Sequence, residues 1–167
     1  MKTSFVLTFI VLCAVDVLSV NVGANITKSC KLPDGYVLVP GHGAYKLHTN
    51  LVTWDSARKS CVEEGAHLAI VDSPVELTIF QIYRSTNNLK SDSKGIWLGY
   101  HNQFELRQWI TVLDEPFVAG KNVGWTPLIP NMPDNYGGNQ HCARLIDGGL
   151  DDVECLGKYP YICEIAL

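Results

Sequence analysis

The sequence has few charged residues, and it has no cluster of lysine and arginine. Charged side chains make up 18% of the 167 residues, and the formal net charge is −4 at pH 7. Nucleic-acid-binding domains carry a basic patch or stripe, so we expect no nucleic-acid partner. Motifs of catalysis are also missing, namely the GxSxG nucleophile motif, the phosphate-binding loop and HExxH. These absences argue against an enzyme.

Long hydrophobic runs are missing too, with one exception near the start. An apolar run over residues 5–15 follows Lys2 and is succeeded by small residues. This is the layout of a secretory signal peptide, and the run is shorter than the roughly 20 residues that span a bilayer. We therefore predict a signal peptide over residues 1–24, with cleavage near Ser19 as the alternative, and a secreted, extracellular chain without membrane insertion. The only N-glycosylation sequon begins at Asn25, which makes Asn25 the candidate glycosylation site.

The remaining chain, residues 25–167, has the length of one domain and an odd number of cysteines. They are Cys30, Cys61, Cys142, Cys155 and Cys163. In an oxidising compartment an odd count means two disulfides and one thiol left over. Four cysteines allow three pairings, and spacing alone does not choose among them.

Hydrophobic periodicity predicts a hairpin and a helix at the start of the domain. Two short strands over 35–40 and 44–48 flank a glycine-rich turn. Asn50 as an N-cap, apolar residues at helical spacing and Gly65 as a C-cap glycine predict a helix over 51–64.

A second helix and three strands follow. The run 67–71 is typical of a buried strand. Ser73, Pro74 and Glu76 form the signature of a helix N-terminus, and we expect this helix to reach about Arg84. Strands are predicted over 97–100 and 109–112, followed by a long irregular loop over 116–133, a kind of segment that is usually functional or disordered. The tryptophans are interpreted as core residues, and they are Trp54, Trp97, Trp109 and Trp125.

The stretch 132–163 is rich in side-chain oxygens and also holds three of the cysteines. Its carboxylates are Asp134, Asp151 and Asp152, and its amides include Asn135 and Gln140. Calcium takes six to eight oxygen ligands and tolerates irregular geometry. The stretch therefore predicts a calcium site on a disulfide-stapled loop, with a solvated turn at the Asp151-Asp152 pair as the alternative.

The order of these parts resembles a C-type lectin-like domain over residues of about 30–167. The resemblance rests on the run from Trp54 to Cys61, on Gly65-Ala66-His67-Leu68, on Trp97-Leu98-Gly99 and on the spacing of the last four cysteines. The sequence is most similar to secreted lectins of insect haemolymph, and related lectins occur in parasitoid wasps and their viruses. The resemblance implies an α+β fold in which two helices flank antiparallel sheets and a long loop carries a calcium site. It also implies the bridges Cys61–Cys163 and Cys142–Cys155 and a cis bond before Pro133.

The family's sugar site maps onto this chain with departures. The tripeptide that holds calcium and sugar corresponds to Met132-Pro133-Asp134, the glutamate after it to Gln140, and the Asn-Asp pair to Asp151-Asp152. Met132 offers sulfur where calcium prefers oxygen. We therefore expect a weakened calcium and carbohydrate site at Asp134, Gln140, Asp151 and Asp152. Asp134 favours galactose-type ligands, and Tyr136 either stacks on the sugar or is an ordinary exposed loop residue.

The resemblance implies a secreted, calcium-dependent lectin of innate immunity or its modulation. Its partners would be glycans on microbes or blood cells, lipopolysaccharide among them. The alternative is a calcium-independent, protein-binding module such as a venom or virulence factor. Cys30 lacks the partner that longer family members have near Ala44, so it either links two chains into a homodimer or stays a free or capped thiol.

Overall fold

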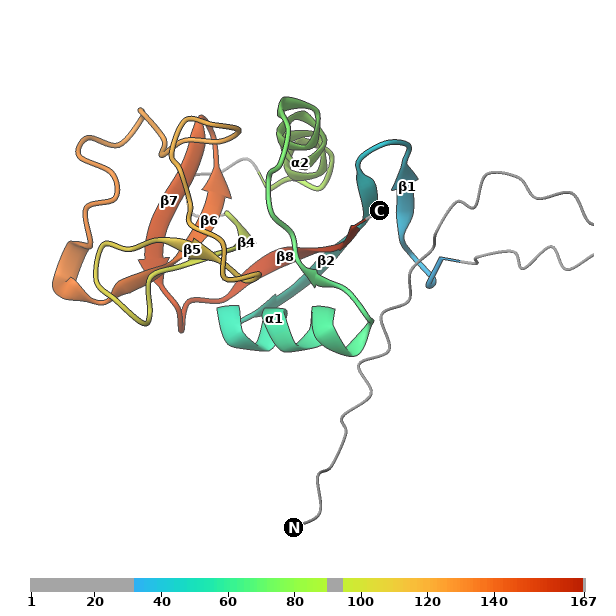
Figure 1. The fold of residues 1–167 in the computed structure, drawn as a ribbon, viewed down its shortest axis with the longest axis horizontal. Coiled ribbons are helices and arrows are strands. Elements are labelled where there is room, and N and C mark those ends of the chain that lie inside the picture. Colours follow the sequence, from blue (N-terminus) through green and yellow to red (C-terminus); the bar gives the residue numbers. More distant parts are fainter. Residues whose placement is uncertain (1–31, 90–94, 167) are drawn as a thin grey trace, which may run out of the picture.

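The computed structural model of the protein describes residues 32–89 and 95–166 (Figure 1). The predicted signal peptide over 1–24, the sequon at Asn25 and the leftover cysteine Cys30 lie outside these ranges. The described residues form an α+β domain, as predicted, in which two helices pack beside a mixed sheet.

The sheet within the described ranges has eight strands. They are β1 (Val37–Val39), β2 (Gly43–Val52), β3 (His67–Leu68), β4 (Ile96–His101), β5 (Ile110–Thr111), β6 (Gln140–Ile146), β7 (Gly149–Glu154) and β8 (Tyr159–Ala166). Their order is β1-β2-β8-β4-β6-β7, with β3 paired to β8 and β5 paired to β4. β4 and β8 run parallel, whereas the other pairs are antiparallel. The antiparallel sheets that the resemblance implies are thus confirmed, with one parallel pairing added.

The first helix begins later than predicted. α1 spans Trp54–Glu63, and its N-cap is Thr53. The prediction of Asn50 as the N-cap was wrong, because the preceding residues continue β2 as far as Val52, which pairs with Tyr159 of β8. Tertiary strand pairing overrides the helical spacing of the local sequence here.

The second helix confirms its predicted N-terminus. α2 spans Pro74–Thr86, and the Ser73 side chain accepts a hydrogen bond from the Glu76 backbone N–H at 3.2 Å. The Glu76 carboxylate in turn accepts from the Ser73 N–H at 2.9 Å, which completes a capping box. Glu76 also accepts from the Tyr45 hydroxyl of β2 at 2.7 Å. The cap therefore ties α2 to the sheet.

The strand predicted over 67–71 is shorter than expected, because β3 ends at Leu68. The next three residues are buried; the Ala69 N–H still donates to the Ile162 carbonyl of β8 at 2.9 Å, whereas Ile70 and Val71 leave the ladder. The Ile70 N–H donates to the Glu164 carboxylate at 3.0 Å, and the Val71 N–H donates to the Tyr100 hydroxyl at 2.7 Å. Side chains from other strands thus replace the missing ladder bonds.

The oxygen-rich stretch, predicted as a stapled loop, is largely the β6–β7 hairpin. Gln140 opens β6, whereas Asp151 and Asp152 lie within β7. β7 is buried at every residue but the last, so it lacks the alternation of polar and apolar residues that reveals a half-buried strand. Three of the four candidate ligands, Gln140, Asp151 and Asp152, therefore stand on this hairpin, and Asp134 lies in the loop before it.

Both disulfides have the predicted pairing. Cys61–Cys163 joins α1 to β8 across 102 residues, and Cys142–Cys155 closes 13 residues around the β6–β7 hairpin. Trp54, Trp97 and Trp109 are buried, and Trp125 packs edge-on against Trp109 at 4.7 Å between ring centroids, which confirms their interpretation as core residues. Neither described helix is long and apolar enough to cross a bilayer.

Candidate functional site

Asp152 anchors the loop of the predicted site through hydrogen bonds. It lies on β7 and is fully buried. Its two carboxylate oxygens accept hydrogen bonds from the backbone N–H groups of Asp134 at 3.1 Å and Asn135 at 2.8 Å. Burial raises the pKa of Asp152, and these N–H groups oppose the rise. Hydrogen bonds to this carboxylate therefore hold the segment that follows the cis Met132–Pro133 bond.

A second hydrogen-bond network includes the Tyr136 backbone N–H. This group donates to the Asp134 carboxylate at 3.0 Å and to the Gln140 side-chain oxygen at 2.6 Å. The Gln140 N–H donates to the Asn135 side-chain oxygen at 2.9 Å. Two predicted ligands, Asp134 and Gln140, thus turn their oxygens toward one point on the loop. The Tyr136 ring, 80% exposed, projects away from the core.

Asp151 has a different partner. One oxygen of its buried carboxylate accepts from Nε of Arg144 at 2.9 Å and lies 2.8 Å from Nη2 of the same guanidinium. Burial raises the pKa of Asp151, and the guanidinium opposes that rise. Arg144 also lies over the Tyr159 ring, 4.7 Å from its centroid. Asp151 is therefore held by an internal cation.

The structure thus brings together three of the four predicted calcium ligands through the 132–140 segment. Asp134, Gln140 and Asp152 are oxygen donors of the type that calcium prefers. The three aspartates, however, are not among the described groups whose ligand atoms all lie within 4.8 Å of one another. The one such group is His48, Glu64 and Cys163, and the Cys163 sulfur is bound in a disulfide. The donor chemistry fits calcium at Asp134, Gln140 and Asp152, and Asp151 is committed to Arg144.

A cavity of about 170 Å³ lies against these carboxylates. Its lining residues are Asn102, Leu106, Arg107, Trp109, Pro133, Asp134, Asn135 and Asp152. Asp152 and Trp109 are buried and form its inner surface, whereas Leu106, Arg107 and Asp134 are exposed at its rim. The cavity therefore opens beside two of the predicted ligands.

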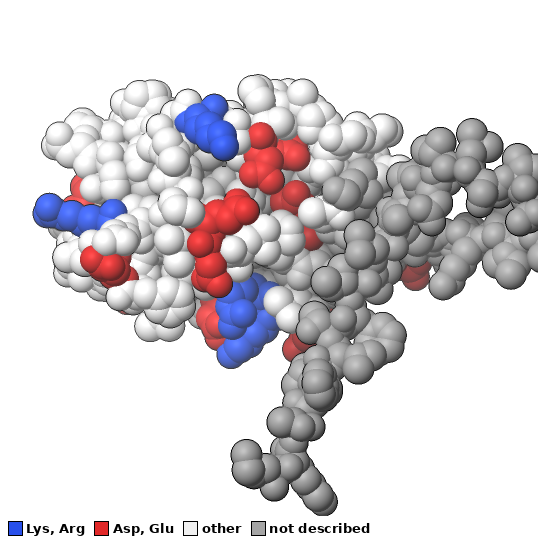
Figure 2. All heavy atoms as spheres, in the orientation of Figure 1, with Lys and Arg blue, Asp and Glu red and all other residues white. Residues whose placement is uncertain are grey.

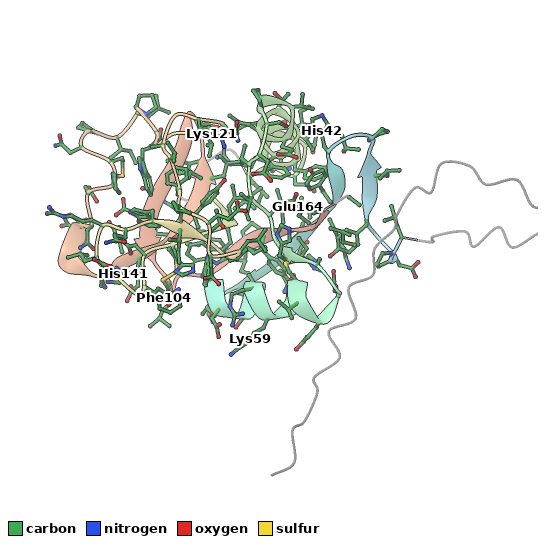
Figure 3. All side chains as sticks on the ribbon, viewed as in Figure 1. His42, Lys59, Phe104, Lys121, His141 and Glu164 are labelled. Carbon is green, nitrogen blue, oxygen red and sulfur yellow. A yellow bond between two sulfur atoms is a disulfide. The ribbon has the colours of Figure 1, made fainter. Side chains whose placement is uncertain are left out.

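Sequence reasoning missed the residues between β4 and β5 that complete this cavity. Asn102, which is buried, accepts a hydrogen bond through its side-chain oxygen from Nδ1–H of His141 at 3.0 Å, and so links the end of β4 to β6. Phe104 and His141 lie at the same end of the molecule (Figure 3). Arg107 and Arg144 belong to no motif. Only the fold pairs Arg144 with Asp151 and places Arg107 in one cavity lining with Asp134 and Asp152.

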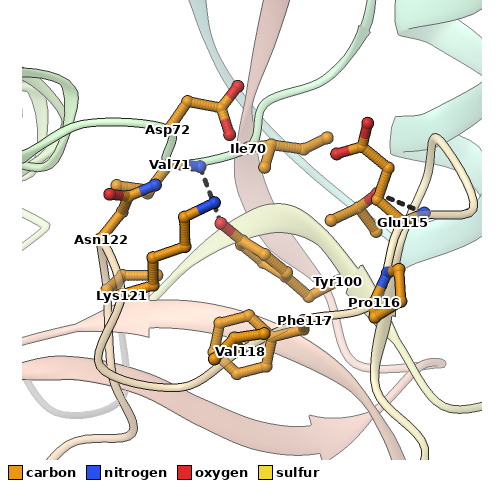
Figure 4. Close-up of a pocket in the computed structure, with 12 residues that line it drawn as sticks. Ile70, Val71, Asp72, Tyr100, Glu115, Pro116, Phe117, Val118, Lys121 and Asn122 are labelled. Carbon is orange, nitrogen blue, oxygen red and sulfur yellow. Dashed lines mark hydrogen bonds between the residues drawn. The ribbon is translucent and has the colours of Figure 1, made fainter.

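A smaller cavity of about 70 Å³ lies elsewhere, between the Ile70–Asp72 segment and the 115–123 loop (Figure 4). The Tyr100 hydroxyl accepts the Val71 N–H at its edge. None of the predicted ligands lines it.

On the face shown in Figure 2, basic side chains are scattered beside a band of acidic ones, without an extended basic patch.

Comparison with known proteins decides the family. The family model described as "Lectin C-type domain" matches residues 50–165. The chain belongs to the C-type lectin family. Members of this family commonly bind calcium, and the match places the chain among binding proteins rather than enzymes.

Individual C-type lectins support the assignment. A hemolymph lipopolysaccharide-binding protein of Periplaneta americana is 34% identical over 84% of this chain and 56% of its own length. Salivary C-type lectin 2 of Aedes albopictus is 24% identical over 72% of this chain and 82% of its own length. The chain thus spans little more than half of the cockroach protein.

A solved lectin structure confirms the fold. The carbohydrate-recognition domain of the mouse scavenger receptor C-type lectin superimposes with a TM-score of 0.63, covering 80% of this chain and 97% of that domain at 19% identity. This likeness is one of fold.

Proposed function

We propose that the chain is a secreted, calcium-dependent lectin that binds glycans on microbial or blood-cell surfaces. The glycans include lipopolysaccharide, and the role is innate immune recognition or its modulation. The observation that carries the proposal is the cavity beside Asp134 and Asp152 in a member of the C-type lectin family. The relative from Periplaneta americana, named for lipopolysaccharide binding, supports the ligand class.

Calcium in this site would supply positive charge and coordinate sugar hydroxyls. Asp134, Gln140 and Asp152 would hold it through side-chain oxygens. Asp152 also positions the loop, because both its oxygens already accept backbone N–H groups. Asp134 favours galactose-type ligands in this family, and the exposed Tyr136 ring is placed to stack on the apolar face of a sugar.

Calcium titration calorimetry on the full secreted chain, combined with retention on galactose-agarose, tests this function. We expect heat from calcium binding, retention of the protein, and elution by a chelator. Asp134→Ala should weaken both signals, because it removes an exposed ligand without opening the core. Asp55→Ala, which removes an exposed carboxylate on α1, is the matched control and should change neither. Absence of calcium heat at millimolar concentrations, with no retention on any sugar, would contradict the proposal.

The pairing of Asp151 with Arg144 favours a second candidate, a calcium-independent module that binds a protein. The internal cation occupies one carboxylate, and Met132 removes an oxygen ligand from the tripeptide. Cell agglutination separates the two functions. Agglutination that a chelator abolishes and calcium restores supports the lectin, whereas attachment that persists in chelator supports the module.

A covalent dimer would increase the apparent affinity of two weak sugar sites. A disulfide between two copies of Cys30 would place two sugar sites in one molecule, and avidity would then raise the apparent affinity for a cell surface. Electrophoresis without reductant should show a dimer band that reductant converts to monomer. A single monomer band under both conditions would exclude the covalent dimer.

A further inference from the structure

We infer that the cavity beside Asp134 selects saccharides that carry an acidic group, carboxylate or phosphate, and that the Arg107 guanidinium binds this group. The inference rests on the proposed lectin function, because it assigns the ligand class of the same site. It adds a specificity-determining residue from the segment between β4 and β5, which no motif singles out.

The position of Arg107 is the first observation. Arg107 and Leu106 line the cavity from the 102–109 segment, and Pro133, Asp134 and Asn135 line it from the 132–135 segment. Arg107 is exposed at the rim, so its guanidinium is accessible to a ligand that enters from solvent. No ion pair of Arg107 with another residue is found in the described part of the chain. A planar guanidinium is suited to bidentate binding of carboxylate or phosphate.

The backbone at Arg107 is the second observation. Its φ angle is +69°, which lies in the left-handed region of backbone conformation that residues other than glycine rarely adopt. The other described non-glycine residues with positive φ are all asparagine or aspartate, the types that tolerate this region best: Asn88, Asp114, Asn131 and Asn135. Arginine has no such local advantage. An unfavourable backbone conformation at the rim of a cavity indicates that the side chain serves a purpose other than folding.

The charge of the lining is the third observation. Asp134 and Asp152 contribute two negative charges and Arg107 contributes one positive charge, while Asp151 is neutralised by Arg144. The lining without metal is therefore net negative and repels an anion. A divalent ion at the carboxylates would reverse the sign. Binding of an acidic saccharide should then depend on calcium more steeply than binding of a neutral one.

The size of the cavity limits the ligand. About 170 Å³ is below the roughly 300–1,000 Å³ of pockets that enclose drug-sized molecules. The cavity therefore holds a single sugar ring or its substituent, and the rest of a glycan lies outside. A monosaccharide with one acidic group is the matching probe.

Galactose and galacturonic acid on the same bead matrix test the inference. They share their ring and vicinal hydroxyls and differ in a CH₂OH that becomes a carboxylate. Galactose 6-phosphate provides a phosphate arm, which shows whether the site prefers one acidic group over the other. With calcium present, the full secreted chain should bind the acidic sugars about fivefold to tenfold more tightly than galactose, as expected of charge-assisted hydrogen bonds. High salt should reduce that preference.

Two substitutions isolate the guanidinium. Arg107→Gln removes the charge, and Arg107→Asn removes it with a residue suited to the positive φ. Both should bring the acidic sugars to parity with galactose. Arg58→Gln, which removes a partly exposed arginine from α1, is the matched control and should preserve the preference.

The outcomes separate this inference from the proposed function. Equal binding of galactose and the acidic sugars by the wild type overturns the inference and leaves the lectin function intact. An equal loss for all three sugars in both variants also overturns it, because Arg107 would then support the loop alone. Calcium-dependent binding of none of the three sugars overturns the inference, and only the further absence of calcium heat and of retention on any other sugar overturns the proposed function as well.

Discussion

Glu164 is a carboxyl group buried in the centre of the sheet, with 2% of its surface exposed (Figure 3). Burial raises its pKa to about 8, the Glu76 and Asp72 carboxylates add to the rise, and the Ile70 N–H opposes it. The folded protein therefore holds a proton on Glu164 at pH values where the unfolded chain has lost it.

This proton makes stability fall as pH rises. The pKa of Glu164 increases from 4.5 in the unfolded chain to about 8 on folding, so the folded state binds more protons between these values. The free energy of unfolding should then decrease by at most about 1.4 kcal/mol per pH unit through this range. Glu164→Gln mimics the protonated form and removes this component.

Urea unfolding of both proteins from about pH 5 to about pH 8 measures the effect. The difference between wild type and Glu164→Gln cancels the contribution of the histidines. We expect the wild type to lose stability relative to the variant as pH rises. A constant difference across the range would show that Glu164 ionises normally in the fold.

At the scale of elements, two side chains cap the N-terminus of α2, and they differ in how many hydrogen bonds they make. The Ser73 side chain satisfies one backbone N–H of the helix. The buried Glu76 carboxylate satisfies the N–H groups of both Asp72 and Ser73 and also accepts the Tyr45 hydroxyl from β2. The two residues differ in that Glu76 joins the helix to the sheet.

Ser73→Ala should therefore cost roughly 1 kcal/mol, the usual value for a lost N-cap. Glu76→Ala should cost about 3 kcal/mol, because it leaves buried hydrogen-bonding groups without partners as well. Denaturant midpoints of the two variants measure this order. Equal losses would mean that the contact with Tyr45 adds nothing to the cap.

At the scale of the whole molecule, the two disulfides constrain different lengths of chain. Cys61–Cys163 links residues 102 apart, and Cys142–Cys155 links residues 13 apart. On the loop-closure model the long bridge contributes close to 5 kcal/mol and the short one roughly 3 kcal/mol. Paired cysteine-to-alanine variants should lose stability in that order when unfolded in urea.

The short bridge should have a further effect on binding. It closes the hairpin that carries Gln140 and Asp152, so Cys142→Ala/Cys155→Ala should weaken calcium binding even at temperatures where the variant stays folded. Calorimetry on that variant, with circular dichroism as the check on folding, measures this loss. Unchanged calcium affinity would show that the β6–β7 ladder alone positions the ligands.

The sequence by itself determined the family, the α+β class, the capping box of α2 and, through the resemblance to the family, the disulfide pairing. These features depend on residues close in the chain or on a pattern that the whole family shares. Ser73, Pro74 and Glu76 are near neighbours, and their hydrogen bonds follow from helix geometry alone.

Only the tertiary structure decided the end of β2, the partner of Asp151 and the position of Arg107. Val52 is a strand residue because β8 lies beside it, and Asp151 is paired with a cation because strand register places Arg144 opposite. Arg107 lines the same cavity as Asp134 and Asp152 because the segment after β4 lies beside a loop that comes later in the chain. Contacts between distant segments depend on register and packing, and local sequence patterns carry neither.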